Sequence, residues 1–258
     1  MKKPIHPLWG IVEIAAFAGI YFSVVFFWGL QIAKSPGLIM AVWVLIIAKA
    51  IYLLWISPLV LHMDKPTIRG WQLFGRGPDN PGSFKNAWPL YIAVTFIGAM
   101  VLTGYALFLH QGVFPHLDTK AMAVKFFVYL SWAVIQGIVF FGFILVRLRG
   151  VAGVFTGGEN TLRHCGAVVV LTAIIFAAFH FPNPELTIFA FMAGIIWAWV
   201  FYNRPNIVLM GLSHAFLGTM LHQVVQLYMR IGPFYQNPEA NIVTHIVPGL
   251  SRLMDYIF

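Results

Sequence analysis

Residues 87–110, AWPLYIAVTFIGAMVLTGYALFLH, contain no Asp, Glu, Lys or Arg. A run of this length matches the roughly 20 apolar residues that a helix needs to cross a bilayer. Similar runs recur along nearly the whole chain, in which 60% of the 258 residues are hydrophobic and 9% are charged. A water-soluble fold cannot bury so much apolar surface. The sequence therefore predicts an all-α integral membrane protein with one membrane domain over residues 1–258.

The apolar runs predict a polytopic bundle of about seven transmembrane helices. The expected spans are residues 8–33, 37–62, 87–110, 121–147, 165–180, 184–203 and 205–229. The first run is far longer than the apolar region of a signal peptide, so we expect it to be retained as a helix. The fifth and sixth spans are separated by only a few residues, which predicts a tight helical hairpin.

The basic residues give an orientation to this bundle. The formal net charge is +8, and the Lys and Arg residues lie mainly in short loops between apolar runs. With a cytoplasmic N-terminus, the cytoplasmic segments hold Lys2, Lys3, Lys65, Arg69, Arg76, Lys85, Arg147, Arg149, Arg163 and Arg204. The other side holds Lys34, Lys120, Lys125, Arg230 and Arg252. This follows the positive-inside rule and predicts an outer-side C-terminus, with a bacterial inner (plasma) membrane as the expected location.

Two segments outside the spans differ from them in composition. Residues 63–86 are rich in Gly and Pro, which predicts an irregular cytoplasmic loop. Residues 241–258, NIVTHIVPGLSRLMDYIF, are too short to span and mix apolar with charged positions, which predicts an interfacial C-terminal segment. No segment of the chain carries a basic stripe interleaved with aromatic residues, so we expect lipid and other membrane proteins as partners, and no nucleic acid.

Ionisable residues inside the spans are the first functional candidates, because they are costly in a bilayer. Lys49 lies near the middle of the second span, and Glu13 lies within the first. We expect a structural ion pair between them if the lysine stem reaches toward the carboxylate. A proton or ion pathway, or a contact of Lys49 with lipid or a partner, are the alternatives. The single cysteine, Cys165, excludes an internal disulfide and a cysteine-rich metal site.

Three histidines form the second group of candidates. His180 ends the fifth span, while His214 and His222 lie eight residues apart on the seventh, with Gly218 midway between them. Residues eight apart fall on nearly the same face of a helix. Such a face can bind a metal or a porphyrin, or it can hold buried imidazoles that bond to neighbouring helices.

Three blocks of sequence carry a resemblance to a known family. The fifth span ends FAAFH, in which Phe176 and His180 match a Phe-x-x-x-His motif, and SHAFLGT follows one span later with His214. Upstream lies QGIVFFGFIL, residues 136–145. In order and spacing these blocks resemble the CPBP family, the CAAX prenyl endopeptidase and bacteriocin-processing intramembrane proteases. The resemblance covers residues 120–225, which we take as a CPBP-like core.

The chain departs from that family at its reactive positions. Where the family has two glutamates, this chain has Gln136 and Gly137. Phe141 stands at the position of the family's arginine, and Gly218 stands at the position of its asparagine. The resemblance implies that a glutamate activates water while the histidines and the asparagine hold it and stabilise the oxyanion. Glutamine cannot take the proton of that water. The family positions His180, His214 and Gln136 are therefore expected to be catalytically inactive or nearly so.

A straight-helix estimate leaves the pairing of the histidines open. At about 1.5 Å per residue, His180 and His214 differ in depth by roughly 10 to 15 Å. Either the short fifth span is sunk into the membrane, which brings His180 to His214, or His180 and His222 form the closer pair.

Four functions remain at this stage. The first is a protein that keeps the CPBP-like fold without proteolysis and acts as a partner, assembly factor or subunit of a membrane complex. The second is a metalloendopeptidase in which His180, His214 and His222 hold zinc and its bound water. The third is a subunit that binds a haem or another porphyrin-type pigment through His214 or His222. Transport is the fourth, and Lys49 is the main argument for it.

Overall fold

The chain folds as a bundle of helices. The computed structural model describes residues 3, 5–27, 35–63, 81–112, 117–157, 161–233 and 235–236, and these residues contain no strand. The helices are α1 (Trp9–Phe22, continued by the π-helical Ser23–Phe27), α3 (Pro36–Ile51, continued by the π-helical Tyr52–Leu61), α4 (Phe84–Leu109), α5 (Thr119–Gln136), the π-helical η4 (Gly137–Leu145), α6 (Val146–Thr156), α7 (Leu162–Ala178), α8 (Pro184–Asn203) and α9 (Ile207–Gln223). The predicted all-α bundle is confirmed.

Among the residues that the structure describes, five helical segments are long and apolar enough to cross a membrane. They are Trp9–Phe27, Met40–Leu61, Phe84–Leu109, Thr119–Thr156 and Pro184–Asn203. The two others, α7 and α9, have 17 residues each. At about 1.5 Å per residue, α7 is about 26 Å long, which is shorter than the roughly 30 Å hydrocarbon core of a bilayer.

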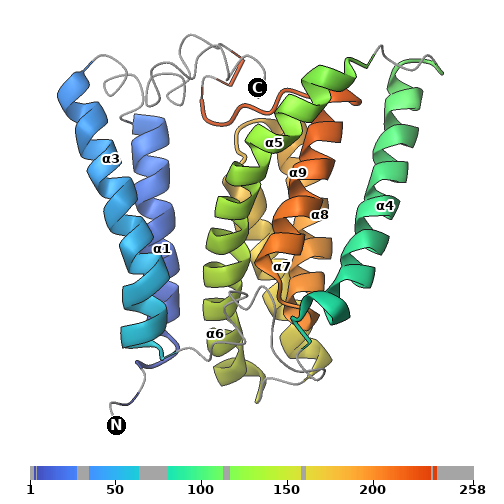
Figure 1. Ribbon diagram of the computed structural model, residues 1–258. Coiled ribbons are helices and arrows are strands. Elements are labelled where there is room, and N and C mark those ends of the chain that lie inside the picture. Colours follow the sequence, from blue (N-terminus) through green and yellow to red (C-terminus); the bar gives the residue numbers. More distant parts are fainter. Residues whose placement is uncertain are drawn as a thin grey trace.

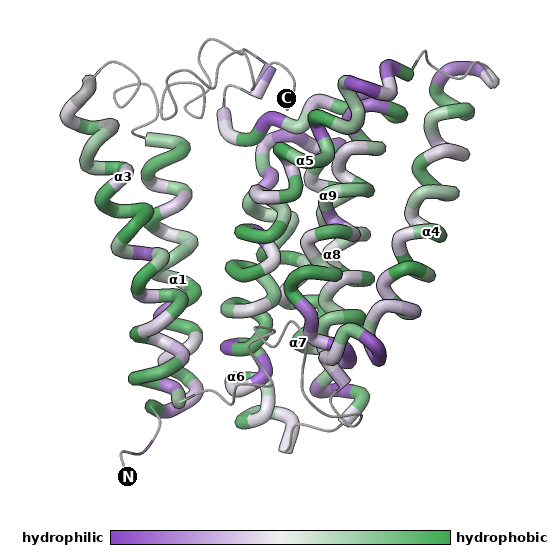
Figure 2. The backbone as a smooth tube through the Cα atoms, viewed as in Figure 1, coloured by the Kyte–Doolittle hydropathy of each residue, from purple (hydrophilic) through white to green (hydrophobic). Residues whose placement is uncertain are grey.

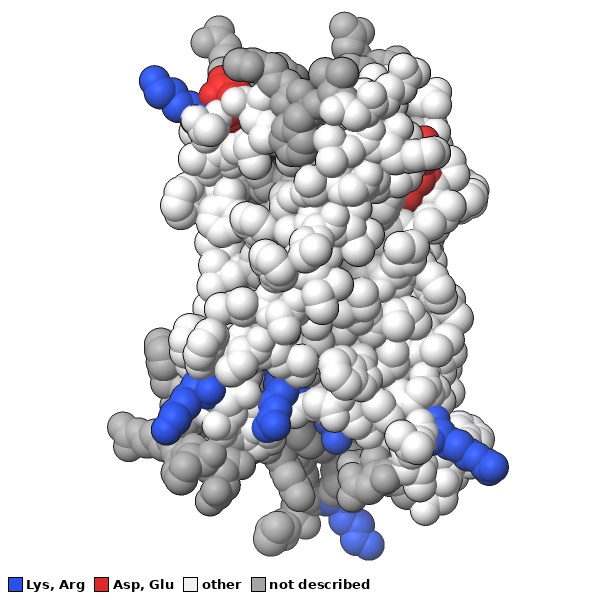
Figure 3. Space-filling model, turned by 90° about the vertical axis from the view of Figure 1, so that its right-hand side faces the viewer, with Lys and Arg blue, Asp and Glu red and all other residues white. Residues whose placement is uncertain are grey.

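The outer surface of the bundle is apolar, as expected of a surface that contacts lipid. Large apolar side chains stand on the outside of the bundle, among them Phe108 with 79% of its area exposed and Phe96 with 65%. The tube in Figure 2 is largely hydrophobic along the helices. On the face shown in Figure 3, the middle band has no Lys, Arg, Asp or Glu, and basic side chains gather at the end where α1 begins.

The helices form three groups in space (Figure 1). α1 and α3 stand side by side at one edge, and α4 stands at the opposite edge. Between them, α5 packs along α9, and α7 packs along α8. The first group meets the central one chiefly through contacts of α1 with α6.

Side-chain caps explain where several helices begin. Asp118 accepts hydrogen bonds from the backbone N–H groups of Lys120 and Ala121 at the start of α5, at 2.9 and 3.1 Å. Thr161, Asn183 and Asn206 cap α7, α8 and α9 in the same way. Each cap satisfies a backbone donor that the first turn of a helix leaves unpaired. The Asn183 cap of α8 lies in the tight turn predicted between the fifth and sixth spans, whereas the Thr161 cap of α7 lies at the other end of α7.

Two predicted boundaries differ from the structure more than the others do. The fourth span was expected to end at Arg147, but helical structure continues from Thr119 to Thr156, because Arg147 has an acidic partner inside the bundle. α6 ends instead at Gly157, whose φ of 72° is the left-handed conformation typical of a helix C-terminus. The seventh helix ends at Gln223, before the predicted 229. The predicted segment 241–258, and residues 64–80 of the predicted loop 63–86, lie outside the described residues.

Candidate functional site

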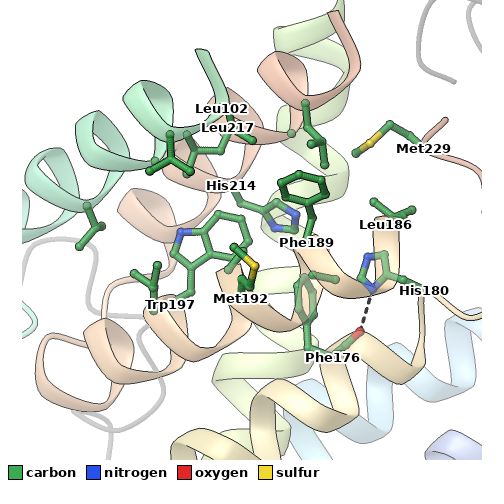
Figure 4. Close-up of a pocket in the computed structure, with 18 of the residues that line it drawn as sticks. Leu102, Phe176, His180, Leu186, Phe189, Met192, Trp197, His214, Leu217 and Met229 are labelled. Carbon is green, nitrogen blue, oxygen red and sulfur yellow. Dashed lines mark hydrogen bonds between the residues drawn. The ribbon is translucent and has the colours of Figure 1, made fainter. Parts of the chain in front are cut away.

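A mostly apolar cavity of about 200 Å³ lies within the bundle. Its walls come from α4, α5, α7, α8 and α9 (Figure 4). The lining residues are Val94, Ile97, Gly98, Val101, Leu102, Tyr129, Phe176, His180, Leu186, Phe189, Ala190, Met192, Ala193, Ile196, Trp197, His214, Leu217, Gly218, Leu221 and Met229. None of them is acidic or basic apart from the two histidines.

The cavity reaches the outside of the bundle between α4 and α8. Ile97 on α4 and Met192 on α8 both line it, yet 58% and 49% of their areas are exposed. Since this surface faces lipid, the cavity is open to the bilayer rather than to water.

His180 and His214 line the same cavity. The ring of Phe176 lies beside both, with centroids 4.8 Å from that of His180 and 5.8 Å from that of His214. This arrangement agrees with the first of the two alternatives above, because α7 is short and ends at Ala178 within the bundle. The chain then turns, and His180 reaches the cavity that His214 also lines.

The imidazole of His180 is oriented by its own helix. Its Nδ1 lies 2.7 Å from the carbonyl oxygen of Phe176, to which it donates a hydrogen bond. A neutral imidazole has one N–H, so Nε2 is left as an acceptor. The neighbouring Phe179 is held by α1, because the hydroxyl of Tyr21 donates to its carbonyl oxygen at 3.0 Å and the ring of Phe17 stacks on it.

His214 is held between an aromatic ring on α8 and a hydroxyl on α5. The ring of Trp197 lies 4.5 Å from the imidazole, and its indole N–H donates to Ser213 Oγ at 3.1 Å. On the other side, Tyr129 Oη lies 3.2 Å from Nε2 of His214. Nδ1 of His214 is buried and has no hydrogen-bond partner.

Tyr129 fills the position at which the family has its asparagine. A Cβ atom added to Gly218 would lie 2.2 Å from Cε1 of the Tyr129 ring. Only glycine therefore lets α5 and α9 approach with the tyrosine between them. Sequence reasoning missed Tyr129. The one signal for it was a glycine in place of a polar residue, which indicated that some other side chain occupies the space.

The residues at the family's glutamate and arginine positions belong to the apolar interior. Gln136 ends α5, does not line the cavity, and has a buried side-chain oxygen without a partner. Phe141 is fully buried, with ring centroids 5.9 Å from those of both Phe176 and Phe201. No carboxylate from this segment reaches the histidines.

His222 does not join the other two histidines. It pairs with the amine of Lys125, which is buried, and it does not line the cavity. Within the described part of the chain, no three His, Cys, Asp or Glu side chains lie together as metal ligands would. His180, His214 and His222 are therefore not the zinc ligand set that the sequence suggested, since a protein zinc site needs at least three ligands.

A porphyrin does not fit the cavity either. Pockets that take drug-sized ligands have volumes of about 300–1,000 Å³, and this cavity has about 200 Å³. The ring of Trp197 further covers one side of His214.

The predicted pair of Glu13 with Lys49 is wrong. Glu13 pairs with Arg147 on α6, whose Nε lies 3.0 Å from its carboxylate, and with Nε2 of His62 at 2.9 Å. The hydroxyl of Tyr52 donates to the same carboxylate at 2.5 Å. The amine of Lys49 instead lies 4.0 Å from the centre of the Phe17 ring, so its contact is a cation–π interaction.

A known protein family matches part of the chain. Residues 118–220 match the family described as Type II CAAX prenyl endopeptidase Rce1-like. The matched residues overlap residues 120–225, for which the sequence motifs indicated the resemblance, and they contain Tyr129, His180 and His214. No curated protein matches the chain. No solved structure matches it.

Proposed function

We propose that this chain, whose residues 118–220 form an Rce1-like domain of the CPBP family, is a non-proteolytic member that works by holding an apolar molecule inside the membrane. In this role it serves as a partner or subunit of a membrane complex. Its N-terminal end faces the cytoplasm, as the gathering of basic residues at that end favours.

One observation carries the proposal: the cavity contains two imidazoles and no carboxylate. Hydrolysis of a peptide bond at neutral pH needs a base to take the proton of the attacking water, and a positioned base contributes about 10² to 10⁴ in rate. Gln136 has no basic group and lies outside the cavity. The family's asparagine is also missing, and losing one oxyanion donor costs about a further 10² to 10³.

The remaining features of the cavity suit binding. Its walls are apolar, and its opening between α4 and α8 leads to the lipid. A hydrophobic molecule can pass from the lipid through such an opening without crossing water. Its binding then rests on packing contacts with the cavity walls, because lipid tails and the walls are similarly apolar.

The test is an assay of cleavage in proteoliposomes with a prenylated CAAX peptide as substrate, run beside an active member of the family. We expect no cleavage above that of empty liposomes, and no change on His214→Ala or His180→Ala. Cleavage by the wild-type protein that disappears with His214→Ala would overturn the proposal, because the histidines would then support chemistry without a glutamate.

A further inference from the structure

We propose that the molecule held in the cavity is a neutral, apolar compound with a carbonyl oxygen, and that Nδ1–H of His214 donates a hydrogen bond to this oxygen. The inference rests on the proposed binding function and names the class of ligand.

The hydrogen-bond pattern of His214 defines which nitrogen carries the proton. The hydroxyl of Tyr129 has its hydrogen bond with Nε2 of His214, at 3.2 Å. If Nε2 carried the proton, the hydroxyl hydrogen of Tyr129 and Nδ1 of His214 would both lack a partner. If Tyr129 donates to Nε2, one group alone is left over, which is an N–H at Nδ1. Because buried polar groups are paired wherever possible, the second arrangement holds.

The unpaired group is therefore a donor, and it selects an acceptor. His214 is 96% buried, so bulk water does not satisfy this N–H. Its neighbours Trp197 and Phe176 present rings to the imidazole and offer no acceptor oxygen. A carbonyl oxygen from a bound molecule supplies the missing acceptor.

The walls of the cavity require the rest of the ligand to be neutral and apolar. No Asp, Glu, Lys or Arg lines the cavity, so an ionised headgroup would be buried without a counter-ion. His180 presents Nε2 as an acceptor, which does not favour a carboxylate or phosphate either. The tail of the ligand lies toward Ile97 and Met192 and continues between α4 and α8 into the lipid.

The experiment compares two probes of equal chain length, undecan-2-one with a ¹³C-labelled carbonyl and undecane, on the full chain in detergent. We expect the ketone to bind roughly five- to tenfold more tightly than the alkane, the ratio that one neutral hydrogen bond supplies. We also expect the infrared band of the labelled carbonyl to move to lower wavenumber when the ketone is bound. His214→Phe should abolish both effects.

His222→Gln is the matched control, because His222 lies two turns further along α9, outside the cavity. It should leave the affinity ratio and the band unchanged. Equal binding of ketone and alkane without a band shift in the wild-type protein would overturn this inference and leave the binding function intact. Binding of neither probe would overturn the binding function itself. The wild-type measurements decide between these outcomes even if His214→Phe fails to fold.

Discussion

Two buried polar centres of this protein, one around Glu13 and one around His214, are built in opposite ways. Around Glu13 the polar groups pair with one another. Arg147 and His62 contact the carboxylate, and Ser57 accepts a hydrogen bond from the Arg147 guanidinium at 2.9 Å. Around His214 the side chains are neutral, and one donor has no partner beside a cavity. A cluster whose groups pair with each other joins helices, whereas a cluster that leaves a donor free beside a cavity is suited to a ligand.

The Glu13 cluster joins the two parts of the chain. Glu13 and Ser57 lie in the first two helical segments, and His62 directly follows the second. All three lie outside residues 118–220, which match the Rce1-like family, whereas Arg147 lies within them. The ion pair therefore anchors the N-terminal helices to the domain. Phe17 and Tyr21 of α1 in turn hold Phe179, next to His180, so this anchoring also positions one side of the cavity.

The largest expected effect comes from breaking the ion pair. Glu13→Leu leaves the guanidinium of Arg147 buried without its counter-ion, which should cost about 3–5 kcal/mol of unfolding free energy. The double variant Glu13→Leu/Arg147→Leu should recover much of this loss, since it buries no unpaired charge. Denaturant unfolding in detergent measures both.

Lys49→Leu is the control for this cycle, because Lys49 contacts the Phe17 ring and not a carboxylate. Lys49→Leu should lower the unfolding free energy by less than Glu13→Leu does. The ion pair would not be what joins the N-terminal helices to the rest of the bundle if Glu13→Leu and Lys49→Leu lowered the unfolding free energy equally. The same would hold if the double variant were as unstable as Glu13→Leu.

An intermediate effect is expected where Tyr129 meets α9. Gly218→Ala places a methyl group against the tyrosine ring, and overpacking of this kind costs about 1–3 kcal/mol. Thermal unfolding measures the loss. Adding Tyr129→Leu should relieve part of it, because the shorter side chain vacates the space.

Gly166→Ala on α7 is the matched control, since nothing lies within 4 Å of the added Cβ. It should stabilise the helix by about 0.5–1 kcal/mol, the usual difference between the two residues. If Gly218→Ala also stabilised the protein, the close approach of Tyr129 to Gly218 would be wrong.

The smallest effect is expected at the cavity itself. In Tyr129→Phe/His214→Phe, two groups that bond chiefly to each other are both replaced by apolar rings. Such a paired replacement is nearly neutral, so the unfolding free energy should stay within about 1 kcal/mol of wild type, while binding of the ketone probe loses its advantage. A loss as large as that of Glu13→Leu would assign a structural role to the pair and remove the contrast between the two centres.

Much of the fold was accessible from the sequence because it depends on local composition. Apolar runs of about 20 residues specify membrane helices wherever they occur, and the capping residues Asp118, Thr161, Asn183 and Asn206 act on the turn that follows them. The short motifs around Phe176, His180 and His214 likewise indicated the family, and residues 118–220 match it.

The partners of the polar residues were not accessible in this way. Glu13 was paired with Lys49 because both lie in neighbouring spans, yet the carboxylate turns to Arg147 on α6. His222 shares a helix face with His214 but lies against Lys125. Which groups meet depends on how each helix is rotated and how deeply it sits, and side-chain packing between distant segments determines both.

The sequence by itself thus determined that the chain is an all-α membrane bundle, which family its second half resembles, and that the family's glutamates, arginine and asparagine are absent. The tertiary structure alone decided that His180 and His214 line one cavity, that Tyr129 occupies the space at Gly218, and that Nδ1 of His214 is left without a hydrogen-bond partner. The physical reason is that helix formation follows from residues three and four apart, whereas a site forms where helices distant in sequence pack together.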